Sequence, residues 1–403
     1  NVGGNTSVTR SGGGFTVASV SGINGLVIDN AGTASVILAT ASADRDITFS
    51  APVNKSGAGA ATLSLNASRD IVLEQNLASS NGALSMVFTA DSDTNGTGGV
   101  VAQGNLTTAG GNLTFDGIGT IFSGGSAQSI TTARGSVDFN GEVLIANTNG
   151  LSISTSNGNV TFDSLINSGN TYAYQSTAKT WNTAMTDWTS GAGGAIGSTY
   201  LATVTSALEM TGVMAAAAGA QSWLGGSDVT NEGTWRWVAG PEGLEESGNG
   251  RTFWTTAQST GATGYTGYNS QYVNWNGGEP NDSGGNEDAL QMGAGLTGQW
   301  NDLPTSSSTL GSVVETNLAA SPLTVNAGSG TITFSGAVGS QKALSSLNVT
   351  STGGIAINGG AVTTEGAQTY AGNVISGNFA AYGGDITASD TSNDFTGTVS
   401  VVS

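Results

Sequence analysis

The chain of 403 residues contains no cysteine and no histidine. Without thiolate or imidazole ligands, a metal site of the zinc or copper type is excluded. No disulfide can support the fold, and cysteine usage says nothing about the redox compartment. Acid–base and nucleophilic catalysis also lose their commonest side chains, so we expect a protein that is not an enzyme.

Positive charge is also scarce, with 9 Lys and Arg against 28 Asp and Glu and a net charge of −19 at pH 7. We therefore expect no nucleic-acid partner, because the negatively charged phosphates of nucleic acids bind positively charged proteins. No run approaches the ~18 consecutive apolar residues of a membrane span, so we expect no membrane insertion. The chain begins at Asn1 without a signal-peptide pattern. We interpret it as a processed chain or a piece of a longer one.

What the chain does contain is a repeat. The segments GNLTFDG at 111–117, GSVDFNG at 135–141 and GNVTFDS at 158–164 follow one another at offsets of 24 and 23 residues. Each alternates apolar and small polar residues between Gly or Asn, which is typical of short strands with one buried face. A propeller blade needs a period of about 40 residues or more, so this period predicts the rung of a parallel β-helix. Phe115, Phe139 and Phe162 should then stack in an internal ladder.

The repeat stops and then resumes. GTITFSG at 330–336 has the same form, and Ile332 is followed by Ile355 at an offset of 23. Between these parts the composition changes, since all eight tryptophans lie between Trp181 and Trp300. We predict β-helix repeats over 1–168 and 320–403, interrupted by a globular domain at 169–319 that has its own core. Within that domain we predict helices over 177–188 and 201–221, with short strands around 222–226, 233–240 and 312–315.

The stretch 274–302, NWNGGEPNDSGGNEDALQMGAGLTGQWND, concentrates oxygen ligands in a chain of which only 9% is charged. Oxygen ligands without His or Cys favour a hard cation, Ca²⁺ before Mg²⁺. A solvated acidic loop is the alternative, and the flanking Trp275 and Trp300 count against it. The carboxylates and amides are Glu279, Asn281, Asp282, Glu287, Asp288, Asn301 and Asp302.

Two family resemblances follow from these motifs. GNLTTAGGNLTFDG and SISTSNGNVTFDS resemble the repeats of filamentous-haemagglutinin-like bacterial adhesins, which implies a right-handed parallel β-helix. The middle section resembles a C-type lectin-like domain, without the family's disulfides. Together they imply a mainly β chain, a solenoid with an inserted α+β C-type lectin-like domain. The motifs of the second resemblance are, in order, Trp181 with Ala184, YLATVTS with Glu209, WLGGSD, EGTWRWVAG, NWNGGEPN, EDALQM, WNDLP and VVE.

The lectin resemblance also implies a set of site residues. A sugar-binding Ca²⁺ site would be held by Glu279, Asn281, Glu287, Asn301 and Asp302. A second, structural Ca²⁺ site would be held by Asp228, Glu232, Asp282 and Asp288. Pro280 lies where the family has a cis proline. The positions where the family commonly has cysteines are Trp188, Ala289, Thr305 and Val314, which implies that packing replaces the cross-links.

In this family Glu-Pro-Asn goes with mannose, glucose, N-acetylglucosamine or fucose, and Gln-Pro-Asp with galactose. The resemblance therefore implies a calcium-dependent adhesin that prefers mannose-type glycans, on a bacterial cell surface or otherwise extracellular, with shafts that could join end to end. The rival hypothesis is a filament or surface-layer subunit whose lectin-like domain uses Ca²⁺ for stability or binds protein. A glycosidase with paired Glu287 and Asp288 fits poorly, because adjacent residues in one glycine-rich loop do not flank a bond.

Overall fold

The computed structural model describes residues 6–10, 15–17, 25–188, 194–257, 267–293, 298–396 and 398–402. The chain divides into two compact units. The solenoid unit consists of Asn1–Gly169 together with Ala320–Ser403, and the inserted unit is Asn170–Ala319.

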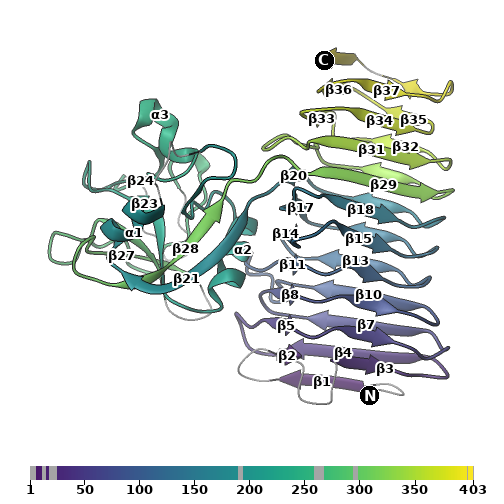
Figure 1. Cartoon of the computed structure of the whole chain (residues 1–403), viewed down its shortest axis with the longest axis horizontal. Coiled ribbons are helices and arrows are strands. Elements are labelled where there is room, and N and C mark those ends of the chain that lie inside the picture. The colour runs from purple at the N-terminus through teal and green to yellow at the C-terminus, as the bar shows by residue number, and fades with distance from the viewer. Residues whose placement is uncertain are drawn as a thin grey trace. The chain divides into compact units, whose positions relative to one another are not determined.

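The solenoid unit is a stack of rungs whose strands form three faces, and within each sheet the strands pair in parallel with their equivalents in neighbouring rungs (Figure 1). The mainly β fold and the parallel solenoid predicted from the repeat are therefore confirmed. A single residue, Val338, bridges Ile166 to Val362 and links the two halves of the third face.

The first face consists of β1 (Thr6–Arg10), β4 (Ala34–Thr40), β7 (Ala61–Asn66), β10 (Leu84–Thr89), β13 (Leu113–Asp116), β16 (Val137–Phe139), β19 (Val160–Phe162), β30 (Ile332–Phe334), β32 (Ile355–Ile357), β35 (Val374–Ser376) and β38 (Asp394–Phe395). The second consists of β3 (Leu26–Ile28), β6 (Val53–Lys55), β9 (Leu77–Ser79), β12 (Leu106–Thr107), β15 (Gln128–Thr131), β18 (Leu151–Ser154), β29 (Pro322–Gly328), β31 (Ser346–Ser351), β34 (Gln368–Ala371) and β37 (Ile386–Ala388). The third consists of β2 (Phe15–Val17), β5 (Ile47–Phe49), β8 (Ile71–Leu73), β11 (Val100–Ala102), β14 (Gly119–Phe122), β17 (Glu142–Ile145), β20 (Ile166–Ser168), β33 (Ala361–Thr363), β36 (Phe379–Tyr382) and β39 (Val399–Val402).

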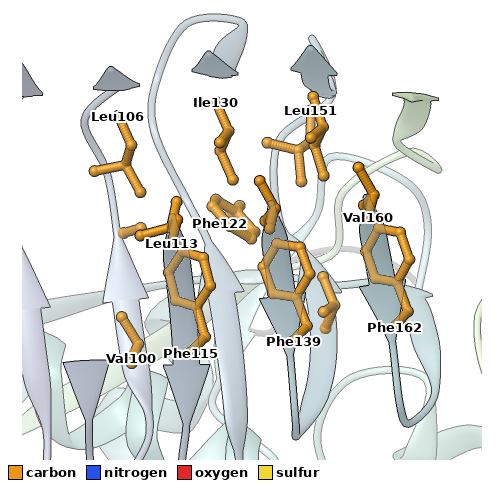
Figure 2. Packing of buried hydrophobic residues seen from close by; sticks show 14 of the residues in the cluster. Val100, Leu106, Leu113, Phe115, Phe122, Ile130, Phe139, Leu151, Val160 and Phe162 are labelled. Carbon is orange, nitrogen blue, oxygen red and sulfur yellow. The ribbon is translucent and has the colours of Figure 1, made fainter. Parts of the chain in front are cut away.

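The predicted phenylalanine ladder is present in the core. Phe115, Phe139 and Phe162 occupy equivalent positions in successive rungs, and Phe334 continues the series. Their rings are nearly parallel, with centroids 4.7, 4.9 and 5.3 Å apart along the stack. Figure 2 shows Phe115, Phe139 and Phe162 side by side in one row, among other buried apolar side chains. The spacing is that of neighbouring strands, so strand pairing and ring stacking support the same register.

The turn between two faces explains why the repeat carries Thr and Gly three residues apart. Thr108 Oγ1 donates to the carbonyl of Gly111 at 2.6 Å, and Thr132 makes the same bond to Gly135. At Gly135 a Cβ atom would lie 1.8 Å from the carbonyl oxygen of Gly111 in the previous rung. Only glycine permits this approach of the two backbones, so the turn residue is dictated by stacking.

The solenoid continues across the inserted segment. Leu151 pairs with Leu323, and Val160 pairs with Ile332. Ser168 Oγ accepts the N–H of Ser321 at 2.9 Å and donates to the carbonyl of Ala343 at 2.7 Å. The residues on both sides of the insertion are therefore held by the same solenoid rungs.

The inserted unit is an eight-stranded, mostly antiparallel sheet with three helices and two short 3-10 turns among its described residues. Strands β21 and β28 pair over most of their length, with Thr171 opposite Thr316. The elements are β21 (Thr171–Lys179), α1 (Trp181–Trp188), β22 (Thr199–Leu201), α2 (Ala207–Ala217), β23 (Ser222–Ser227), β24 (Thr234–Trp237), η1 (Glu242–Leu244), α3 (Glu245–Gly248), β25 (Arg251–Thr255), η2 (Tyr268–Ser270), β26 (Ala289–Met292), β27 (Trp300–Leu303) and β28 (Leu310–Thr316).

The two predicted helices exist but are shorter than predicted. Residues 177–179 end strand β21, because Lys179 pairs with Leu310. Leu201 belongs to β22, opposite Val314, and α2 begins only at Ala207. Ser206 caps α2 by accepting the N–H of Glu209, as a capping box requires.

The core of the inserted unit is aromatic and contains no cross-link. Trp235, Trp237, Phe253, Trp275 and Trp300 are all buried, with ring centroids between 4.5 and 6.5 Å apart. A second apolar cluster contains two of the positions where the resemblance implied cysteines in the family, Ala289 and Val314, with Trp188 packed against it. Apolar packing therefore occupies three of these positions, as the resemblance implied.

The phenylalanine ladder gives a stability prediction. Replacing Phe139 by Ala removes a ring packed on both sides and should cost about 3 to 5 kcal/mol, because the neighbouring rungs cannot close the space. Urea unfolding followed by circular dichroism measures this loss. Thr161→Ala, on the outward side of the adjacent strand, is the control and should change stability by about 0.5 kcal/mol or less. Equal effects of both changes would contradict a core that depends on the ladder.

Candidate functional site

The oxygen-rich loop of residues 276–288 is fixed at its base by two buried tryptophans. Trp275 and Trp300 form a bridge between the segments that carry them. The N–H of Trp300 donates to Asn274 O at 2.7 Å, and the N–H of Asn276 donates to Trp300 O at 2.8 Å. Residues 294–297 of this stretch lie outside the described residues. The loop thus starts beside strand β27, which carries two of the predicted ligands.

Asp302 organises the first group of site residues. It is completely buried, and its two carboxylate oxygens accept the N–H groups of Asn281 at 3.3 Å and Asp282 at 2.8 Å. Asn281 Nδ2 donates to Glu279 Oε2, and the Glu279–Pro280 peptide bond is cis. These contacts bring three of the five predicted sugar-site residues together.

Burial, followed by the neighbouring Asp302 and Glu287, raises the pKa of Glu279 to about 7. Burial also raises the pKa of Glu287, and the charges of Asp302 and Asp282 add to that effect. Carboxylates this close disfavour one another's ionised form unless a positive charge is supplied. Glu287 therefore belongs electrostatically to the same group as Glu279 and Asp302.

Asn301 is the fifth predicted member, and its amide nitrogen donates to groups outside the other four side chains. Its Nδ2 donates to Gln291 Oε1 at 3.1 Å and to the carbonyl oxygen of Asp302 at 2.8 Å. Gln291 lies directly opposite it on β26 and is 5% exposed. The sequence analysis assigned no role to Gln291, although it lies within the EDALQM motif.

Asp228, Glu232 and Asp288 form a second group of carboxylates. One oxygen from each lies within 4.8 Å of the other two. Asp282, predicted as a fourth member, is not in this group of mutually close ligand atoms. Its Oδ1 accepts the N–H of Glu287 at 3.1 Å. It still lies near enough for its charge to raise the pKa of both Glu232 and Asp288, after the larger effect of burial.

Asp228 is the buried member of that group. Only 3% of it is exposed; Oδ2 accepts the N–H of Gly233 at 2.9 Å, whereas Oδ1 is buried with no hydrogen-bond partner. Burial and the charges of Glu232 and Asp288 raise the pKa of Asp228 to about 7. Ser227 Oγ donates to the carbonyl of Asp288 at 2.6 Å, which holds the two segments together.

A buried carboxyl that the sequence reading missed lies elsewhere in the inserted unit. Glu315, on β28, is 2% exposed and accepts hydrogen bonds from Asn170 Nδ2 at 2.5 Å and from the N–H and Oγ1 of Thr203 at 3.0 and 3.1 Å. Burial, with the charges of Glu209 and Glu242, raises its pKa to about 8. No sequence signal groups these glutamates, because they come from separate elements.

The solenoid unit carries another oxygen-rich loop, DSDTNGT at 91–97, which the sequence reading also passed over. Its D-x-D-x-N-G spacing matches the first half of a calcium loop and could have marked it. In the structure the carboxylate of Asp91 accepts the N–H groups of Asn95 at 2.9 Å and Gly96 at 3.2 Å. These bonds account for the turn by themselves.

No protein-family model matches the chain. Halomucin of Haloquadratum walsbyi is 35% identical over 82 residues, which are 20% of this chain and 1% of that protein. The chain thus corresponds to a very small part of this relative. Among the described residues, no helix is long and apolar enough to cross a membrane.

Several solved C-type lectin structures are similar to part of the chain. Lectin CEL-I of Cucumaria echinata is 21% identical over 36% of this chain and 87% of that chain, with a TM-score of 0.26. The cow C-type carbohydrate-recognition domain of CD23, solved in the presence of a GlcNAc2Man3 oligosaccharide, is 23% identical over 37% and 88%, with a TM-score of 0.26. A herring type II antifreeze protein is 20% identical over 38% and 93%, also with a TM-score of 0.26. Scores this low carry no argument about function.

Glu315 gives a pH prediction. Its folded pKa of about 8 lies above its ordinary value of 4.5, so between these pH values the folded state keeps a proton that the unfolded state releases. Stability therefore falls as pH rises through this window, by at most about 1.4 kcal/mol per pH unit from this one group. Glu315→Gln should flatten that part of the pH dependence, as measured by urea unfolding in chelator from pH 5 to 8. Parallel curves for the two proteins would contradict the assignment.

Proposed function

We propose that the inserted unit is a calcium-dependent carbohydrate-binding domain and that the chain acts as an adhesin, without catalytic activity. The observation that carries the proposal is the gathering of carboxylates into two adjacent groups. No Lys or Arg of the described residues forms an ion pair with them. One group contains Glu279, Glu287 and Asp302, and the other contains Asp228, Glu232 and Asp288. An ion that ligates oxygen would relieve both.

The residues fit a hard divalent cation. Asp228 Oδ1 is buried and lacks a hydrogen-bond partner, and it belongs to a group of three carboxylates within 4.8 Å. A buried acceptor of this kind costs free energy unless something satisfies it. Carboxylate oxygens in an irregular, glycine-rich loop suit Ca²⁺, which accepts 6 to 8 oxygens in loose geometry. A cation bound at the Asp228 group would balance the charges of its carboxylates. A cation bound at the Glu279 group would also offer open coordination positions for hydroxyl oxygens.

The side chains around the cation would then determine which sugar binds. Glu279 and Glu287 can only accept hydrogen bonds, whereas the amide of Asn281 can also donate. Asn281 is exposed and hydrogen-bonded to Glu279. The order of acceptor and donor along Glu279, Pro280 and Asn281 sets which hydroxyl of a vicinal pair donates and which accepts. We propose mannose-type ligands over galactose-type ones on this basis, as the lectin resemblance implied.

Display on the solenoid would compensate for a weak single site. A shallow site that holds one sugar binds weakly, and many copies near a surface raise the effective concentration. We propose an extracellular or bacterial-surface location for this reason. The rival proposal is a filament or surface-layer subunit that uses Ca²⁺ for stability alone, or that joins other copies end to end. Absence of glycan binding in the sugar experiment would favour this rival.

Calcium should stabilise the inserted unit. At a calcium concentration 100 times the dissociation constant the gain is about 2.7 kcal/mol per site. Tryptophan fluorescence follows this unit, because all eight tryptophans lie in it. Asp228→Asn should raise the melting temperature in chelator, by removing a buried like charge, and should reduce the gain in calcium. Asp163→Asn, an exposed carboxylate of the solenoid, is the matched control and should keep the full gain.

Equal calcium-induced gains in the wild type and Asp228→Asn would contradict the assignment of Asp228 as a ligand. Absence of any gain in the wild type would contradict cation binding altogether.

Sugar binding should require calcium and follow the Glu279–Asn281 pair. On a glycan array, the wild type should bind mannose-type ligands with calcium and lose them with EGTA. The double variant Glu279→Gln with Asn281→Asp should move the preference towards galactose, because the order of donor and acceptor is reversed. Calcium-dependent stabilisation without binding to any glycan would reject the lectin function and favour the structural rival. Unchanged specificity of the double variant would reject the site assignment.

A further inference from the structure

We infer that Ser227 is a positioning residue for the three carboxylates that include Asp228 and Asp288. This set, with Glu232 as its third member, is the Asp228 group. The Ser227 hydroxyl joins the two chain segments that carry Asp228 and Asp288, and so keeps their carboxylates within reach of one cation. This role rests on the proposed binding of a cation by the group, and it adds a residue outside the predicted ligand set.

A single oxygen atom makes the connection. Ser227 Oγ donates to the carbonyl oxygen of Asp288 at 2.6 Å, and it accepts the N–H of Val229 at 3.2 Å. The second bond is local, a turn that serine commonly forms with the residue two positions later. The first bond joins residues 61 positions apart. The backbone on both sides of Asp228 is therefore tied to the backbone of Asp288.

Strand pairing is irregular where this connection is made. Trp223 on β23 lies opposite Gln291 on β26, and Ser227 lies opposite Ala289. Four steps along β23 thus correspond to two along β26, so β23 carries two extra residues. A bulge of this kind interrupts the ladder of backbone hydrogen bonds. The bond from Ser227 Oγ reaches Asp288, one residue beyond Ala289, and extends the connection between the strands to the residue that carries the ligand.

The hydroxyl acts against the repulsion of the carboxylates. One oxygen from each member of the group lies within 4.8 Å of the other two, and ionised carboxylates this close disfavour one another. Asp228 and Ser227 are only 3% and 2% exposed, so water screens them little. A site held in place before the cation arrives binds it more tightly than one that must first be assembled.

Replacing Ser227 by Ala removes the connection and leaves the strands otherwise unchanged. Outer side chains that orient metal ligands commonly contribute about 10- to 100-fold to metal affinity. Calcium titration calorimetry on the full chain should therefore show a dissociation constant about tenfold higher in Ser227→Ala, for the site that Asp228→Asn abolishes. Ser227→Thr keeps the hydroxyl and should stay within about twofold of the wild type.

Ser222→Ala is the matched control. Ser222 begins the same strand and is completely buried, and its Oγ donates to the carbonyl oxygen of Ala220 at 3.2 Å. This variant also loses a buried hydroxyl, but far along β23 from the carboxylates. It should keep the calcium dissociation constant of the wild type within about twofold, whatever stability it loses.

Two further measurements separate positioning from general loosening. In the Asp228→Asn background, adding Ser227→Ala should not change the calcium binding that remains, because the serine acts through Asp228 and Asp288. In chelator, hydrogen exchange of the Val229 amide, followed by NMR, should be faster in Ser227→Ala than in the wild type. The rate should return to the wild-type value in Ser227→Thr and stay there in Ser222→Ala.

An unchanged calcium dissociation constant in Ser227→Ala, in a wild type that binds calcium, would overturn the inference and leave the proposed function standing. Equal weakening by Ser222→Ala, or by Ser227→Thr, would overturn it as well, because the hydroxyl at 227 would then not be what matters. A wild type that binds no calcium would overturn the proposed function, and the positioning role of Ser227 with it.

Discussion

The solenoid depends on one constraint, that each strand stacks in register on its equivalent in the rung before. Parallel strands cannot share a tight hairpin, so each rung must travel around the core before it pairs again. Inward side chains then stack on the equivalent side chains of neighbouring rungs, as Phe139 stacks on Phe115 and Phe162. Turns must also stack, which leaves no room for a Cβ at Gly135. The regular sequence of this unit is a consequence of that geometry.

The same constraint makes a large insertion tolerable. Pairing of Leu151 with Leu323 and of Val160 with Ile332 requires only that the two chain segments return to neighbouring positions. Within the inserted unit, β21 and β28 pair antiparallel, so this unit closes its own ends. Neither unit needs a covalent cross-link, because strand pairing fixes the ends and aromatic packing fills the core of the inserted unit. The free energy of closing a long loop rises only slowly with its length.

Sequence reasoning succeeded where a local pattern repeats and failed where contacts join distant elements. The period of 23 to 24 residues predicted the register of Phe115, Phe139 and Phe162 and of Ile332 with Ile355, which the structure confirms. Apolar spacing alone predicted too long a helix where the structure has α2, which ends at Ala217. Leu201, the first residue of the predicted helix, is instead part of the sheet, because it pairs with Val314. Tertiary context overrides propensity in such cases.

In the candidate site, too, local patterns were predictable from the sequence and contacts between separate elements were not. Carboxylates grouped in one loop are visible in the sequence, and the structure brings Glu279, Asn281 and Asp302 together. The bond between Gln291 and Asn301 depends on the register of two strands joined by a loop, and nothing in the residue types predicts it. The partners of Glu315 could not be predicted either, because Asn170 and Thr203 come from distant parts of the chain.

The inserted unit keeps buried carboxyl groups in two different ways, and the contrast supports a cation at only one of them. Both oxygens of Glu315 accept hydrogen bonds from side-chain or backbone donors, and burial raises the pKa of this carboxyl to about 8. Asp228 has one oxygen satisfied and one with no hydrogen-bond partner, and two further carboxylates lie within 4.8 Å of it. A proton alone would neutralise one of those three groups, whereas a divalent cation would balance two charges and satisfy the orphaned oxygen at once. We therefore propose a cation at the Asp228 group and none at Glu315.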